Sequence, residues 1–290
     1  MITKYELIRL AKKLALSSQV IEKDYVLGWI LAGISAHPAL KKSWIFKGGT
    51  CLKKCYFKEY RLSEDLDFTV LEESSLSPEN LLKTFKEISG WIYESSGIQI
   101  PENKIEFESY ENKQKSLSYQ GKLSYAGPLA PASPRHWPRI KLDLTSNEIM
   151  VNDPVILEVC HPYSDCPHPA IQVLSYDKVE IFSEKFRALF ERTRPRDLYD
   201  VVHLSRIPSI FEEHSKLITT LNKKFKFKGL DFPQGDKPPE AQKRLCERSW
   251  KEQLSHQIHG LEEFEIYWRD LEEILNQLKS SILRTRTKTP

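Results

Sequence analysis

The sequence has 290 residues, enough for one large domain or two of ordinary size. Hydrophobic residues make up 40% and charged residues 29%, which is typical of a folded globular protein and excludes a disordered one. No apolar run approaches the roughly 18 residues that cross a bilayer, and the amphipathic N-terminal segment lacks the apolar core and cleavage site of a signal peptide. We therefore expect a cytoplasmic protein without a membrane partner. The net charge of +3 is too small to identify a partner on its own.

The first part of the chain mixes helical and strand patterns. In chain order the predicted elements are two helices over residues 4–36, a strand at 44–47, a helix at 50–57, a strand at 65–70, a helix at 77–97, and strands at 104–110, 115–125, 139–145 and 154–160. Thr50 is a candidate N-cap of the third helix. Trp91 is expected on the apolar face of the helix at 77–97. A proline-rich loop at 126–138 precedes a charged strand, a setting in which loops often border active sites.

After about residue 175 the pattern becomes helical. Further helices are expected over residues 176–207, with a break near Pro195, and at 237–254 and 261–283. We therefore predict two domains. Residues 1–175 hold the N-terminal helices and a mixed α/β core, and residues 176–290 form an α-helical domain.

Three aspartates in this core have the pattern of a divalent-metal site. Asp65 and Asp67 are two residues apart on a predicted strand, so both side chains point to one face. The apolar side chains of Leu66 and Phe68 point to the other face. Two adjacent carboxylates suit a hard divalent cation, above all Mg²⁺. Asp143 lies in a similar apolar–acid–apolar stretch and is a candidate third ligand, with Lys141 on the same strand face.

Residues upstream and downstream of these acids suit phosphate groups. Gly48-Gly49-Thr50 lies at a strand-to-helix turn, where backbone N–H groups and a helix N-terminus attract phosphate. On the later helix, Lys185 and Arg192 share one face at a spacing of seven residues. A glycine turn, a carboxylate pair, a third acid and later cations are, in this order, the parts of a two-metal phosphoryl-transfer site.

Two further clusters leave alternatives open. Cys160, His161, Cys166 and His168 contain zinc-ligand types, but their spacing fits no common zinc motif, so free thiols are the other interpretation. In residues 222–229 the side chains of Lys223, Lys224, Lys226 and Lys228 surround two phenylalanines. This pattern suits a nucleic-acid backbone with stacked bases, as does the basic tail with Arg284, Arg286 and Lys288, but it also fits an edge strand with lysines outward.

Residues 46–68, FKGGTCLKKCYFKEYRLSEDLDF, resemble the signature of the AbiEii/MenT group of nucleotidyltransferase toxins, within the DNA polymerase β-like superfamily. Residues 21–31, with EKDY, and residues 183–204 resemble two further motifs of that group. Much of the wider superfamily has serine at the position of Gly49. The resemblance implies an α+β fold: a polymerase β-like core of mixed or antiparallel sheet with flanking helices, preceded by N-terminal helices and followed by a helical domain.

The resemblance also implies the ligands and the biological role. The protein is expected to use an NTP with Mg²⁺ or Mn²⁺, and to act as the toxin of a type IV toxin–antitoxin or abortive-infection system whose antitoxin is a separate protein. Some relatives modify the 3′ end of tRNA, so tRNA is the expected acceptor. The candidate catalytic residues are Asp65, Asp67, Asp143 and Lys185, of which the three aspartates are the metal ligands. The candidate nucleotide-binding residues are Lys47, Gly48, Gly49, Thr50, Ser63, Lys185, Arg192, Asp197 and Asp200.

Some alternatives stay open. Asp197 or Asp200 is expected to orient Lys185 or Arg192 instead of binding metal, and Arg196 with Asp200 has the spacing of a simple helix salt bridge. The protein as a whole could also be a nucleotide-binding regulator without turnover, or a nucleotidyltransferase of a small-molecule acceptor. The intact set of three acids argues against the first, and the lysine–phenylalanine segment favours RNA over the second.

Overall fold

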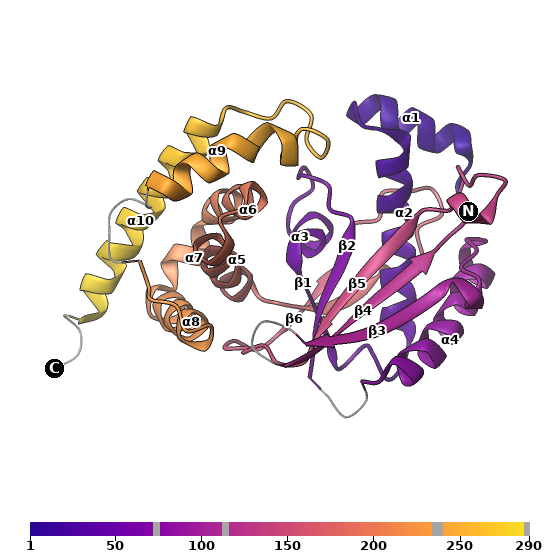
Figure 1. The fold of residues 1–290 in the computed structure, drawn as a ribbon, viewed down its shortest axis with the longest axis horizontal. Helices are drawn as coiled ribbons and strands as arrows, with labels where there is room; N and C mark the ends of the chain where they lie inside the picture. Colours follow the sequence, from indigo (N-terminus) through magenta and orange to yellow (C-terminus); the bar gives the residue numbers. More distant parts are fainter. Residues whose placement is uncertain (72–75, 112–115, 234–239, 287–290) are drawn as a thin grey trace. The chain divides into compact units, whose positions relative to one another are not determined.

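A computed structural model describes the backbone of residues 1–71, 76–111, 116–233 and 240–286, with side chains described up to residue 280. Contacts within the chain define two compact units (Figure 1). Unit 1 comprises Met1–Glu148 and Pro154–Ser175, and unit 2 comprises Ile149–Asp153 and Tyr176–Pro290. Among the described residues, no helix is long and apolar enough to cross a membrane.

Unit 1 begins with the two predicted helices, α1 (Lys4–Leu14) and α2 (Ser18–Ala36). Thr3 and Ser17 cap their N-termini by accepting a backbone N–H three residues later. Most of α2 is buried, including its charged residues Glu22 and Asp24. Buried charges need partners, and those partners lie near the candidate site described below.

A mixed seven-stranded sheet forms the core of unit 1, in the order β3-β4-β5-β2-β1-β7-β6. The strands are β1 (Trp44–Lys47), β2 (Asp65–Val70), β3 (Ile105–Glu111), β4 (Leu117–Ser124), β5 (Arg139–Thr145), β6 (Val155–Glu158) and β7 (Gln172–Ser175). The first six confirm predicted strands. The sequence analysis missed β7, which has only four residues and pairs with β1 in parallel and β6 in antiparallel fashion.

Helices cover one face of the sheet, and the other face carries the polar side chains of the central strands. The helix α4 (Pro78–Ser96), capped by Ser77 and ended by Gly97 as expected, packs against β3 and α2 (Figure 1). Aromatic contacts from Phe85 to Trp44 and from Trp44 to Phe68 fill the space beneath the sheet. Trp91 is 39% exposed, so its expected place on the buried face of α4 is wrong.

The chain turns sharply between β1 and the next helical segment. The helix α3 (Gly48–Cys51) begins at Gly48 and continues into the π-helical turn η1 (Leu52–Tyr56). Lys47 occupies the N-cap position without a side-chain cap, so the prediction of Thr50 as N-cap is wrong. Thr50 is the third residue of α3, and its buried hydroxyl donates a hydrogen bond to the carbonyl oxygen of Asp65. That bond ties the turn to the start of β2.

Unit 2 is helical, as predicted. It contains α5 (Lys178–Arg192), α6 (Pro195–Ser205), α7 (Pro208–Glu212), α8 (His214–Phe227), α9 (Glu240–Leu254) and α10 (Phe264–Arg286). The expected break falls before Pro195, which is the first residue of α6. Residues 222–227 belong to α8, so the edge-strand interpretation of that segment is wrong.

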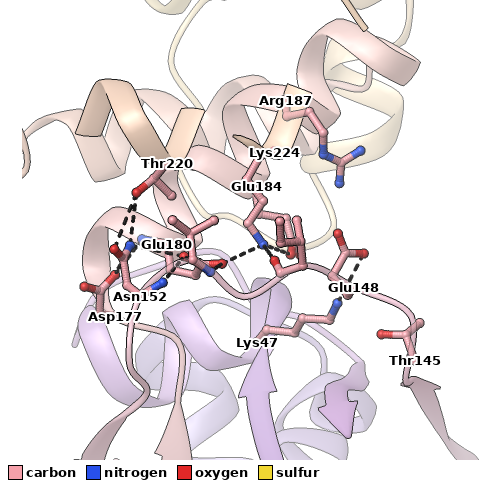
Figure 2. A network of polar contacts seen from close by, with 12 residues as sticks. Lys47, Thr145, Glu148, Asn152, Asp177, Glu180, Glu184, Arg187, Thr220 and Lys224 are labelled. Atoms are coloured by element: carbon pink, nitrogen blue, oxygen red, sulfur yellow. Dashed lines mark hydrogen bonds and ion pairs between the residues drawn. The ribbon is translucent and has the colours of Figure 1, made fainter. Parts of the chain in front are cut away.

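The short segment Ile149–Asp153 joins unit 2 through a buried polar network (Figure 2). Glu180 accepts hydrogen bonds from the backbone N–H groups of Val151 and Asn152 and pairs with Lys224 at 2.7 Å. Lys224 in turn donates to the carbonyl oxygen of Ile149 at 2.6 Å. One buried carboxylate and one buried ammonium therefore bind three backbone groups of this connection: two N–H groups and one carbonyl oxygen.

Candidate active site

The register of the sheet places the predicted acids in neighbouring strands. In the parallel pair β2–β5, Asp67 lies directly opposite Asp143, and Asp65 lies opposite Lys141. In the antiparallel pair β1–β2, Lys47 lies opposite Asp67. Directly paired residues point to the same face, so Lys47, Asp67 and Asp143 form one row across three strands. Asp65 lies one two-residue step from that row on the same face.

The Gly-Gly turn lies against the side chains of this acidic row. Gly48 has φ +79°, and a Cβ atom there would lie 2.1 Å from Oδ2 of Asp67. A Cβ atom on Gly49 would lie 2.5 Å from the guanidinium of Arg61 and 2.9 Å from Oγ of Ser63. Any larger residue would therefore displace one of these side chains, which explains the two glycines.

The electrostatics of Asp65 reflect its burial first and the neighbouring charges second. Burial raises the pKa of Asp65, the positive charge of Lys23 opposes that shift, and the negative charge of Asp143 adds to it. Gln120 on β4 lies opposite Asp143 and donates a hydrogen bond to its Oδ1 at 3.1 Å. On the other side of the row, Nζ of Lys47 lies 4.0 Å from Oε2 of Glu148 (Figure 2).

The donor set fits a divalent cation by chemistry. Three carboxylates on one sheet face are the oxygen ligands that Mg²⁺ prefers. The pKa of Asp65 is raised first by burial and further by the charge of Asp143, and a bound cation would favour the charged carboxylate against both effects. Within the described parts of the chain, no three His, Cys, Asp or Glu side chains converge to form a ready-made metal site.

Comparison with known proteins decides the family. A protein-family model, described as nucleotidyl transferase AbiEii toxin, type IV TA system, matches residues 29–277. The chain belongs to this family. Among solved structures, this AbiEii-family protein is similar to MenT4, a nucleotidyltransferase toxin from Mycobacterium tuberculosis. The TM-score is 0.60 and the identity 15%, over 96% of this chain and 90% of that one, so this likeness supports the fold alone. No curated protein sequence matches the chain.

The family and the fold therefore agree with the predicted nucleotidyltransferase. The AbiEii-family protein is an enzyme of this class and a toxin of a type IV toxin–antitoxin system. This membership implies an NTP substrate and an antitoxin partner. It does not specify the acceptor or the metal.

In unit 2, the predicted cations and acids of α5 and α6 form one cluster. Lys185, only 7% exposed, pairs with Asp200 at 2.8 Å and with Asp197 at 3.8 Å. Arg192 binds the two carboxylate oxygens of Asp197 through Nε and a terminal nitrogen, at 2.7 and 2.8 Å. Both aspartates therefore contact the cations, and their expected role in orienting Lys185 and Arg192 stays a prediction.

The lysine cluster of residues 222–229 does not present four equivalent cations. Lys223 and Lys226 are exposed on α8, and Lys228 is partly exposed just after it. Lys224 has an exposed fraction of 0% and pairs with Glu180, so it is unsuited to nucleic-acid contact and its assignment is corrected. The side chains of the basic tail, Arg284, Arg286 and Lys288, lie outside the described residues.

The four candidate zinc ligands differ in their surroundings. His161 is buried against the rings of Tyr25 and Trp29, while Cys160 and His168 are exposed. Burial, with the nearby charge of Lys54, lowers the pKa of His161 to about 3, so its imidazole is neutral at pH 7.

Two residues near the acids escaped the sequence analysis. Lys23 pairs with Glu64 at 2.6 Å and lies close enough to Asp65 to influence its pKa. The position of Lys23 in the EKDY motif could have marked it as a functional residue, although the sequence gives no reason to connect it with Asp65. Gln120 reaches Asp143 only through the β4–β5 register, and no local pattern marks it.

Proposed function

We propose that this AbiEii-family protein uses Mg²⁺ or Mn²⁺ to transfer NMP from an NTP to a hydroxyl at the 3′ end of tRNA. The observation that carries the proposal is the sheet register, with Asp67 opposite Asp143 and Asp65 one step away. The Gly48-Gly49 turn lies against the same carboxylate row. A divalent ion held by these carboxylates would supply positive charge against the triphosphate and favour deprotonation of the acceptor hydroxyl.

The residues of the turn are assigned to the phosphates of the NTP. With no side chain at Gly48 or Gly49, the backbone N–H groups at the start of α3 can approach phosphate oxygens closely. Lys47, in the adjacent row position, adds a positive charge. The hydroxyl of Thr50 holds β2 to the turn, and Ser63 lies against Gly49. These contacts fix the distance between the phosphate-binding turn and the acids.

Lys185 and Arg192 are assigned to the β- and γ-phosphates. Both are held by carboxylates, Lys185 by Asp200 and Arg192 by Asp197. A cation fixed by a buried partner loses little side-chain freedom when a phosphate arrives, which favours its use in charge stabilisation. Asp197 and Asp200 are therefore positioning residues in this proposal.

The proposal is tested by incubating the protein with each labelled NTP, Mg²⁺ and total tRNA. We expect label on tRNA with at least one NTP, and loss of transfer in Asp65→Ala, Asp67→Ala and Asp143→Ala. The control Asp153→Ala removes a carboxylate outside the proposed acid row. Absence of transfer with all NTPs, or equal transfer by the Asp67→Ala variant, would contradict the proposal.

A further inference from the structure

The strand that carries Asp143 also carries two exposed cations on the same face. Arg139 and Lys141 alternate with the buried residues Ile140 and Leu142 along β5. Two-residue steps on a strand measure about 6.6–6.8 Å, so the three polar side chains form a line about 13 Å long that ends at Asp143. Both cations precede the acid in the strand.

The loop before β5 extends this line. Arg135 is exposed in the short 3₁₀ turn Pro134–His136, four residues before Arg139. Glu22 on α2 holds this loop by accepting the backbone N–H of Leu129, and within the loop the indole N–H of Trp137 donates to the carbonyl oxygen of Pro131. Arg135 therefore lies on a loop whose position is restricted by these hydrogen bonds.

The three cations differ from other basic residues of unit 1 in their pairing. Among the described residues, none of Arg135, Arg139 and Lys141 has a carboxylate oxygen within 4 Å. By contrast, Lys122, which lies opposite Lys141 on β4, pairs with Glu108. Because these exposed cations form no ion pair with the described residues, they remain available for an external anion. The charge of Lys141 also acts on the neighbouring Asp65, whose pKa it lowers.

We propose that Arg135, Arg139 and Lys141 form a basic track that binds the backbone phosphates of a single-stranded RNA 3′ end and directs its terminal hydroxyl to Asp143. This inference rests on the proposed function, because it assigns the acceptor to the β5 side of the acids. The phosphate-binding turn lies on the β1 side of the same row. The two substrates thus approach from opposite sides, which places the acceptor hydroxyl and the NTP on the two flanks of the acids.

The track is tested by the binding of a short single-stranded RNA that ends in CCA and is labelled at its 5′ end. Fluorescence anisotropy is recorded over a range of KCl concentrations for the full chain and for Arg139→Gln/Lys141→Gln. We expect the double variant to bind about tenfold more weakly at low salt, and its log–log salt slope to fall by about 1.4, or about 0.7 for each lost phosphate contact. The single variant Arg135→Gln should lower the slope by about 0.7.

Lys83→Gln provides the matched control, because Lys83 is exposed on α4, which covers the opposite face of the sheet. NTP affinity in the presence of Mg²⁺ should be unchanged in Arg135→Gln and Lys83→Gln, whereas the double variant also removes the charge of Lys141, which acts on Asp65. An unchanged RNA affinity and slope in the double variant would overturn the track. So would a loss of NTP affinity in Arg135→Gln that equals its loss of RNA affinity, or failure of the unaltered chain to bind the RNA at low salt.

These outcomes separate the track from the proposed function. Transfer of label to tRNA with an unchanged KM for tRNA in the double variant would overturn the track and leave the proposed function intact. Loss of RNA binding in the double variant, without any label transfer by the unaltered chain, would support the track and contradict the proposed function.

Discussion

Lys224→Met tests whether the buried network of unit 2 holds the segment Ile149–Asp153 in place. Lys224 and Glu180 are 0% and 1% exposed and lie 2.7 Å apart (Figure 2). Methionine keeps most of the apolar volume of lysine but removes the charge and the hydrogen bond to the carbonyl oxygen of Ile149. The variant therefore leaves a buried carboxylate without its closest cation.

Removing one partner of a buried ion pair costs about 3–5 kcal/mol. The lower part of this range applies here, because Glu180 keeps the N–H groups of Val151 and Asn152. We therefore expect the free energy of unfolding of unit 2 to fall by about 3 kcal/mol. For a domain of this size, that corresponds to a decrease in Tm of about 10 °C.

Urea unfolding followed by circular dichroism measures this loss. Lys226→Met is the matched control, since it makes the same substitution at an exposed position of the same helix. The double variant Lys224→Met/Glu180→Gln should regain part of the stability, because it removes the uncompensated charge. Equal midpoints for Lys224→Met and Lys226→Met would refute the reasoning.

Three further predictions concern unit 1. Gly48→Ala should abolish nucleotide transfer, because Gly48 has φ +79° and its new Cβ would lie 2.1 Å from a carboxylate oxygen. The control variant Gly90→Ala should transfer normally, because no atom lies within 4 Å of the new Cβ. Equal activity of the two variants would contradict the proposed role of the Gly-Gly turn. The folded state protonates His161 only near pH 3 whereas the unfolded state does so near pH 6.5, so acidification favours unfolding. The free energy of unfolding should therefore fall by about 1.4 kcal/mol per pH unit below pH 6.5. Denaturation over a pH series measures this slope, and an equal slope in His161→Phe would exclude His161 as its cause. Thr50→Val should lower the free energy of unfolding by about 1–2 kcal/mol, because the carbonyl oxygen of Asp65 loses its hydrogen-bond donor. Thr50→Ser keeps the hydroxyl and should not lower it, so identical urea midpoints for the two variants would contradict this prediction.

Local patterns predicted most of the elements of the fold. The β2 strand and its two faces follow from alternation over six residues, and α4 follows from its cap and apolar spacing. The pairing of Asp67 with Asp143 could not be predicted, because a parallel register between distant strands depends on the packing of the whole sheet. The sequence supplied the candidate ligands, and only the register placed them side by side.

The segment 222–229 shows why a short pattern can mislead. Its alternating lysines and phenylalanines fit a strand of period two. The preceding residues decide otherwise, because Leu217, Leu221 and Phe225 recur every four residues and all are buried on one face of α8. Lys224 lies beside Phe225 on that face, and the carboxylate of Glu180 makes its burial tolerable.

The EKDY motif on α2 is better explained by contacts that hold the segments around the acids in place than by ligand binding. Its three successive charged residues are separated by about 100° around the helix axis, so they cannot share one ligand. Instead, Glu22 accepts the N–H of Leu129 in the loop before β5, Lys23 pairs with Glu64 beside Asp65, and Asp24 pairs with Lys54 at 2.7 Å.

Each of these contacts ends in a different segment around the acids: the loop that leads to Asp143, the residues that lead to Asp65, and the η1 turn that follows Gly48-Gly49. Hydrogen bonds between these charged side chains and a neighbouring segment restrict that segment more than apolar contacts do, because the partner must stay within about 3 Å at a fixed angle. A change at any of the three positions should therefore act on transfer through the distance between the turn and the acids, even though none of them contacts the nucleotide in the proposed mechanism.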